Sequence, residues 1–231
     1  MATIAKPQAY ALWSSSVGKK ITMAVSGLVL YGFVIVHMIG NLKVYMGREA
    51  FNHYAEGLRT LGDPFFARGQ LLWIARIVLL AALLVHLIAM IQVTLQSRRA
   101  RKHRYKKFDG LEFSYASRTM LWGGVLLLVY VVYHLLHLTF GTVHPNFVHG
   151  DAYNNFVVAF QDPVASAAYI AAMIPLGLHM YHGFWSMLQT LGANNPKYNR
   201  LRRPVALTLA VLVALLNISF PVMVLLGVVT L

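Results

Sequence analysis

Four histidines, His37, His86, His134 and His179, lie in four separate apolar stretches of the chain. An imidazole surrounded by hydrocarbon is costly unless its nitrogen atoms find partners. A single histidine in such a place is commonly a hydrogen-bonded core residue, but one on each of four successive stretches calls for a shared explanation. Haem iron is bound by histidine side chains without any covalent link to the protein. The pattern therefore predicts haem held between helices, with a proton path as the alternative.

The composition indicates an integral membrane protein. Of 231 residues, 58% are hydrophobic and 12% are charged, and the mean hydropathy is +0.59. Five apolar runs each exceed the roughly 20 residues that a spanning helix needs, and they lie near 21–42, 71–95, 119–141, 164–189 and 205–229. We therefore expect an all-α bundle of five transmembrane helices that forms a single domain over residues 1–231.

The absence of cysteine limits the chemistry of any redox centre. A chain without cysteine has no disulfides, no thiolate ligands for an iron–sulfur cluster and no thioether attachment of haem. A haem in this protein must therefore be bound non-covalently. Zinc is a weaker alternative, because thiolates and carboxylates, which commonly complete zinc sites, are missing from the apolar runs.

The basic residues predict the orientation of the chain. Seven Lys or Arg lie within 98–107 and four within 197–203, whereas 142–162 contains none. Because cytoplasmic loops carry the excess of positive charge, we expect the N-terminus inside and the C-terminus outside. Anionic lipid and an acidic partner protein both remain open as further reasons for the basic face. The run at 98–107 is flanked by membrane spans and is not expected to bind nucleic acid.

The depths of the four histidines sort them into two levels. At 1.5 Å of rise per residue, His37 and His134 lie roughly 24 Å and 22 Å from the cytoplasmic edge, and His86 and His179 lie roughly 14 Å and 15 Å from it. Two ligands of one iron need matching depths on facing helices. The levels therefore predict an outer haem between His37 and His134 and an inner haem between His86 and His179.

Two further histidines leave the choice of ligand open. His137 follows His134 by three positions and His182 follows His179 by three, so each doublet shares one helix face. Either member could bind iron. The depth match favours His134 and His179, because the other member of each doublet would lie about one turn away from its partner's level.

Residues near the ends of the spans are further candidates. Arg76 lies inside the outer part of the span at 71–95, where a haem propionate would be a suitable partner, although snorkelling to the interface is an alternative. Glu56, in the segment EAFNHYAEGLR drawn as a short helix, could exchange protons with a quinone or could be a solvated loop charge. Three residues flank the inner end of the first span and are candidates for inner propionates: Lys19, Lys20 and Ser26.

Four segments, in this order, carry a resemblance to a known family: HMIGNLKVYMGREAFNHYAEGLR, LLVHLIA, YHLLHLTFG and GLHMYHGFWSMLQTLG. The chain resembles the dihaem cytochrome b membrane-anchor subunit of succinate:quinone oxidoreductases and fumarate reductases, in the group with a single five-helix anchor (cytochrome b558 type). The resemblance implies two non-covalent haem b groups, one held by His37 and His134 and the other by His86 and His179. It thus implies the same pairs as the depths.

The resemblance also implies the activity. Such anchors bind an iron–sulfur subunit and a flavoprotein subunit and pass electrons between them and a membrane quinone, usually menaquinone. Succinate oxidation then belongs to the partner subunits of this complex in the bacterial cytoplasmic membrane. In some relatives a glutamate two residues before the fourth ligand carries protons, and here that position is Gly177. A dihaem subunit of a nitrate reductase or hydrogenase and a non-redox transporter component are the alternatives.

Overall fold

Five long helices dominate the computed structural model, which describes residues 15–100, 115–193 and 195–231. They are α2 (Ser16–Asn41), α4 (Gln70–Ala100), α5 (Tyr115–His134), α7 (Pro163–Thr190) and α8 (Pro196–Leu225). The 3-10 helix η1 (Leu42–Met46) extends α2, and η2 (Leu135–Thr139) continues α5 as a π-helix. Within the described ranges there is no strand, and five helical segments are long and apolar enough to cross a membrane. The predicted all-α fold with five spans is confirmed.

The last span begins earlier than its hydropathy predicts. The expected range was 205–229, whereas α8 runs from Pro196 to Leu225. The side chain of Asn195 accepts a hydrogen bond from the Lys197 N–H, and Pro196 occupies the first helical turn. This cap and proline start a helix within the basic segment, which an apolarity criterion reads as a loop. The fifth predicted span is therefore present, but its helix begins nine residues earlier than the range near 205–229 and ends at Leu225.

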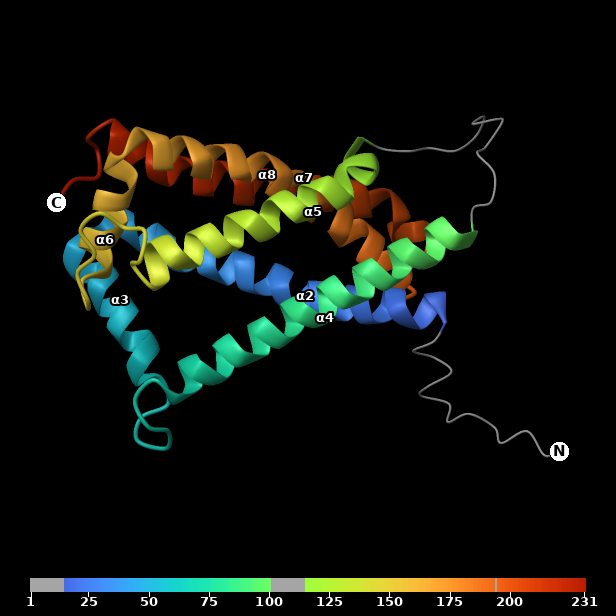
Figure 1. Ribbon diagram of the computed structural model, residues 1–231, viewed down its shortest axis with the longest axis horizontal. Helices are drawn as coiled ribbons and strands as arrows, with labels where there is room; N and C mark the ends of the chain where they lie inside the picture. The colour runs from blue at the N-terminus through green and yellow to red at the C-terminus, as the bar shows by residue number, and fades with distance from the viewer. Residues whose placement is uncertain (1–14, 101–114, 194) are drawn as a thin grey trace.

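The two ends of the bundle are built differently (Figure 1). The short helices α3 (Arg48–Thr60) and α6 (Ala152–Gln161) lie with the C-terminus at one end, which we call the capped end. At the other end α2, α5 and α8 begin and α4 and α7 finish. We call this the basic end, because it carries Lys19, Lys20, Arg98, Arg99 and the basic residues of 197–203. Lys6 and residues 101–107 of the predicted basic run lie outside the described residues.

The helices pack in a defined order. Helix α2 packs against α4 and α7, and α7 packs in turn against α5 and α8. Helix α4 lies at the edge of the bundle (Figure 1), and most of its side chains are exposed on the protein surface. An apolar helix with an exposed surface is what lipid contact requires. This order brings α2 opposite α5 and α4 opposite α7 at the positions of the four histidines.

An aromatic core closes the capped end. Phe51 of α3, Phe156 and Phe160 of α6 and Phe220 of α8 are buried in one hydrophobic cluster. Helix α3 was predicted from EAFNHYAEGLR, and the structure confirms it. Helix α6 was not predicted: residues 142–162 were taken as a connection, but the Asp151 carboxylate caps a helix there by accepting from the Asn154 N–H.

Candidate functional site

The structure brings the four histidines together as two pairs. The ring centres of His37 on α2 and His134 on α5 are 5.9 Å apart. Those of His86 on α4 and His179 on α7 are 6.3 Å apart. All four side chains are half-buried. The rings that lie together are thus those of the two pairs predicted from depth, each joining two different spans.

These separations suit two imidazoles on opposite sides of one metal ion. With a metal–nitrogen bond of about 2.0–2.1 Å and a ring centre about 1.1 Å behind the nitrogen, the two ring centres would stand about 6.3 Å apart. Both observed values are close to this distance. Imidazole is also a common ligand of iron, and two histidines could hold a haem without a further protein donor. The donor atoms and the separation of each pair therefore fit ligands of a haem iron.

The second histidine of each doublet is turned toward other neighbours. The ring of His137 lies 5.2 Å from that of Tyr133 and 5.3 Å from that of His144. The ring of His182 lies 5.3 Å from that of Trp185. In the described part of the chain, neither of these two histidines stacks on a histidine of α2 or α4. Of each doublet, the first member thus faces the opposing span.

At the pair of His86 and His179, which we call the inner pair after the haem predicted for it, a backbone carbonyl and a glycine lie beside the imidazole of His86. His86 Nδ1 donates to the Met23 carbonyl oxygen at 3.0 Å, and because a carbonyl only accepts, this bond places the ring proton on Nδ1. Nε2 then carries a lone pair, as a metal ligand requires. A Cβ atom at Gly27 would come within 3.2 Å of His86 Cε1. His179 Nδ1 is buried and has no hydrogen-bond partner in the described ranges.

At the pair of His37 and His134, which we call the outer pair after the haem predicted for it, the hydrogen-bond partners of the imidazoles are side chains. The Tyr169 hydroxyl lies 3.3 Å from His134 Nδ1 and 3.2 Å from His137 Nδ1. The Asn41 amide nitrogen lies 3.3 Å from His37 Nε2 and donates to it. A metal ion bound to that nitrogen would require Asn41 to turn away. The outer pair therefore fits haem with one side-chain movement more than the inner pair.

Two other predicted site residues, Arg76 and Glu56, have surface side chains as their neighbours. The Arg76 guanidinium lies on the exposed surface, 4.9 Å from the ring centre of Trp73. The Glu56 carboxylate forms ion pairs with Arg59 at 3.4 Å and Arg68 at 2.5 Å. Cation–π contact and ion pairs are ordinary surface interactions. The roles predicted for Arg76 at a propionate and for Glu56 at a quinone stay predictions.

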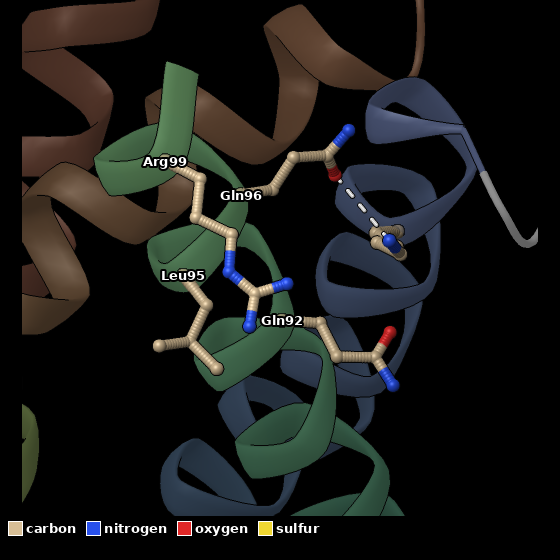
Figure 2. Close-up of a pocket in the computed structure, with 5 residues that line it drawn as sticks. Gln92, Leu95, Gln96 and Arg99 are labelled. Carbon is tan, nitrogen blue, oxygen red and sulfur yellow. Dashed lines mark hydrogen bonds between the residues drawn. The ribbon is translucent and has the colours of Figure 1, made fainter. Parts of the chain in front are cut away.

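A pocket of about 260 Å³ lies at the basic end, between α2 and α4 (Figure 2). Lys19 Nζ donates to Gln96 Oε1 at 3.3 Å, and Arg99 and Gln92 extend from α4 beside them. Two cationic side chains in one pocket favour an anionic group. Ser26, a further candidate here, lies with its hydroxyl oxygen 3.4 Å from His86 Nδ1. The structure does not bring Lys20 into this pocket.

A second pocket, of about 350 Å³, opens on α3 at the capped end. Its walls are partly apolar and carry three polar side chains; the residues are Lys43, Ala50, His53, Tyr54, Gly57, Leu58 and Leu61. The Lys43 ammonium lies 5.8 Å from the ring centre of Tyr54. Apolar walls with a few convergent polar groups are typical of small-molecule sites.

A family comparison decides the class of the protein. The family described as succinate dehydrogenase/fumarate reductase transmembrane subunit matches residues 98–218. The chain belongs to this family. It is therefore a multi-pass membrane subunit of a succinate dehydrogenase/fumarate reductase complex and associates with the other subunits of that complex. No curated protein and no solved structure matches the chain.

The family match covers one histidine of each pair. His134 and His179 lie within residues 98–218, whereas His37 and His86 precede this range. Gly177, where some relatives are expected to carry a proton-transferring glutamate, also lies within it. A Cβ atom at Gly177 would lie 3.6 Å from Ala214 Cβ, so this position belongs to the contact between α7 and α8. This chain therefore has no carboxylate at the position where those relatives are expected to transfer protons.

Sequence reasoning missed three groups that surround the imidazoles: Tyr169, Asn41 and the Met23 carbonyl. A signal for Tyr169 was present, because it is a hydroxyl in an apolar span about 9 Å from the first residue of α7, and His134 lies about 7.5 Å from the end of η2. Matching hydroxyls to histidines by depth would have paired them. The Met23 carbonyl has no sequence signal, because every residue has one.

Proposed function

We propose that this chain is the haem-bearing, quinone-reactive anchor of its complex and passes electrons between an iron–sulfur subunit and membrane quinone. The supporting observation is that four spans of a member of this family bring their histidines together as two pairs, with ring centres 5.9 Å and 6.3 Å apart. His37 and His134 would hold an outer haem b, and His86 and His179 an inner one. Haem supplies the one-electron carrier that amino-acid side chains lack.

The surrounding residues have distinct tasks in this proposal. The Met23 carbonyl holds His86 in the tautomer that leaves Nε2 unprotonated. Lys19 and Arg99 at the basic end supply positive charge for the carboxylates of the inner group, and Arg76 supplies it on the outer side. Apolar side chains of the spans keep water from the imidazoles, so that each pair lies in a medium of low polarity.

We further propose that the basic end faces the bacterial cytoplasm and binds the partner subunits. An excess of Lys and Arg retains a loop on the cytoplasmic side, and the same charge suits an acidic docking surface. An iron–sulfur subunit bound there would lie beside the inner pair, and a flavoprotein subunit attached to it would carry out succinate oxidation. Electrons would then travel along the bundle toward the capped end.

The pocket on α3 is the place we propose for the quinone, with menaquinone as the expected species. Leu58 and Leu61 offer an apolar wall, while His53 and Tyr54 offer groups that can donate to a quinone carbonyl. Glu56 belongs to the same helix and could take up or release protons, once it parts from Arg59 and Arg68. The pocket and the outer histidine pair lie toward the same end of the bundle.

The test is haem analysis of the complex purified from membranes. We expect reduced b-type absorption bands, a pyridine haemochrome that corresponds to two haems per chain, and co-purification of a flavoprotein. A preparation that contains the flavoprotein but no haem would overturn the haem assignment and keep the family assignment. Haem without a flavoprotein would instead indicate a cytochrome of another respiratory complex.

A further inference from the structure

The buried hydroxyl of Tyr169 connects two histidines of the neighbouring span. It lies 3.3 Å from His134 Nδ1 and 3.2 Å from His137 Nδ1. The side chain of Tyr169 is 5% exposed and that of His137 is 2% exposed. Rings of Tyr130, Tyr133 and Phe160 surround the hydroxyl-bearing ring. Water therefore has little access to replace either hydrogen bond.

The protons of this chain of groups can be placed by counting donors. A histidine that binds metal through Nε2 carries its proton on Nδ1, so His134 Nδ1–H must donate to the Tyr169 oxygen. The hydroxyl has one proton of its own, and the remaining acceptor beside it is His137 Nδ1. The order is therefore His134 Nδ1–H to Tyr169 O–H to His137 Nδ1. Reversing both bonds would put the proton of His134 on Nε2 and block that nitrogen.

The π-helical turn η2 makes this arrangement possible. The turn η2 begins directly after His134, the last residue of α5, and it contains His137. A π-helical turn changes the angle between residues three apart, and such turns are frequent at functional sites. The neighbour of His137 is itself fixed: His144 Nδ1 accepts from the Asn146 N–H, so His144 Nε2 donates to the Asn155 carbonyl at 2.9 Å. The ring of His144, held by these two hydrogen bonds, lies 5.3 Å from that of His137.

We propose that Tyr169 is a positioning residue for the outer haem ligand and that His137 is the acceptor that sets the direction of its hydroxyl proton. This inference rests on the proposed function, because it requires that His134 bind iron. Tyr169 would do for His134 what the Met23 carbonyl does for His86: hold Nδ1 protonated and keep Nε2 free. A hydroxyl that donates onward is a better acceptor than an isolated one, so His137 strengthens the bond to His134.

The first experiment compares Tyr169→Phe with Tyr130→Phe in the purified complex. Tyr130 is the matched control, because its ring lies 5.9 Å from that of His134 but its hydroxyl bonds to neither His134 nor His137 in the described part of the chain. We expect Tyr169→Phe to weaken binding of the outer haem about 10–100-fold. The loss would be measured as faster haem transfer to excess apomyoglobin, with the inner haem unchanged.

The same samples give a second readout, the midpoint potentials of the two haem components. Loss of the Nδ1 hydrogen bond makes His134 a poorer electron donor, which destabilises ferric iron, so the outer potential should rise in Tyr169→Phe. His137→Leu should raise it as well, whereas His137→Gln retains an acceptor and should restore it. If Tyr169 acted only by packing, the outer potential would not depend on whether residue 137 can accept a hydrogen bond.

Three outcomes separate the possibilities. Wild-type protein without haem would contradict the proposed function. Wild-type protein with two haems, together with an outer potential and haem transfer rate that are the same in Tyr169→Phe and Tyr130→Phe, would overturn this inference alone. Tyr169→Phe that loses both haems has lost the fold, and the potentials of His137→Leu and His137→Gln then decide: equal values contradict the inference and different values support it.

Discussion

The two histidine pairs of this protein are held by different kinds of groups. At the inner pair, His86 donates to a backbone carbonyl and packs against Gly27, so the chain's own helix geometry does the positioning. At the outer pair, His134 meets the hydroxyl of Tyr169 and His37 meets the amide of Asn41. A carbonyl cannot be mutated away, whereas a hydroxyl or an amide can. The hydrogen bonds of the outer pair are therefore the ones that a side-chain substitution can remove directly.

The two ends of the bundle also differ in the groups that they carry. The capped end has a buried aromatic cluster and carries ion pairs, such as that between Arg48 and Asp151. The basic end has a cationic pocket between α2 and α4. Concentrated charge of one sign suits a partner that carries the opposite charge. This contrast supports the proposal that the partner subunits bind at the basic end.

The largest effect is expected from replacing the paired histidines themselves, and it should distinguish one pair from the other. If the proposal holds, each single substitution of His37, His86, His134 or His179 by alanine should remove one of two haems, because that haem would lose one of the two histidines that would hold it. Pyridine haemochrome analysis should give about half of the wild-type haem. Redox titration should lose one component in His37→Ala and His134→Ala, and the other in His86→Ala and His179→Ala. Loss of the same component in His37→Ala and His86→Ala would break the pairing.

A substitution on α2 should affect the inner pair alone. Gly27→Val places atoms where a Cβ already comes within 3.2 Å of the His86 ring, and overpacking of this kind costs about 1–3 kcal/mol. We expect the affinity for the inner haem to fall about 5–150-fold, measured by haem transfer to apomyoglobin. Gly124→Ala is the matched control, since its Cβ would lie 3.7 Å from His179 Cε1, an ordinary contact. Equal behaviour of the two variants would argue against close packing of His86.

A substitution at the outer pair should raise haem affinity, whereas Gly27→Val should lower it. Asn41→Ala removes the amide that donates to His37 Nε2 and therefore frees that nitrogen for iron. One neutral hydrogen bond contributes about 1 kcal/mol, so the outer haem should bind roughly 5-fold more tightly. The inner component in the same sample serves as the reference. Weaker binding in Asn41→Ala would mean that Asn41 supports the ligand instead of competing for its nitrogen.

The smallest effect concerns the capped end and its pH dependence. Burial alone would raise the pKa of Asp151, but hydrogen bonds from Asn52, from the Asn154 N–H and from Arg48, together with the charge of Arg48, hold it below its ordinary value. A lowered pKa in the folded state adds stability above the unfolded value of about 3.9, and that stability is lost as the pH falls through the folded value. The contribution should be about 1 kcal/mol or less, because Arg48 is half-exposed.

The measurement for Asp151 is thermal unfolding in detergent from pH 6 to pH 3. Asp151→Asn should melt below the wild type at pH 6, and the difference should shrink toward pH 3. Asp162→Asn is the control, because Asp162 also caps a helix but has no arginine partner in the described ranges. A difference for Asp151→Asn that stays constant down to pH 3 would show that its charge does not matter.

Local patterns predicted much of the fold and of the candidate site. Hydropathy located the five spans, and Asn195 with Pro196 shows where it failed, because a helix can start within a polar segment when a cap and a proline favour it. Depth along each helix predicted which histidines lie together, since the rise per residue is the same in every helix. Helix α6 escaped notice because it is too short to give a hydropathy signal.

The sequence by itself determined that this chain crosses a membrane five times and that its histidines lie at two depths, because apolar length and helical rise are properties of each segment alone. Tertiary structure decided the rest. Whether Tyr169 reaches His134, whether Asn41 occupies His37 Nε2 and which member of a doublet faces the opposing span depend on the rotation of each helix and on the π-helical turn at η2. Hydrogen bonds of about 3 Å respond to such rotations, which no single helix specifies.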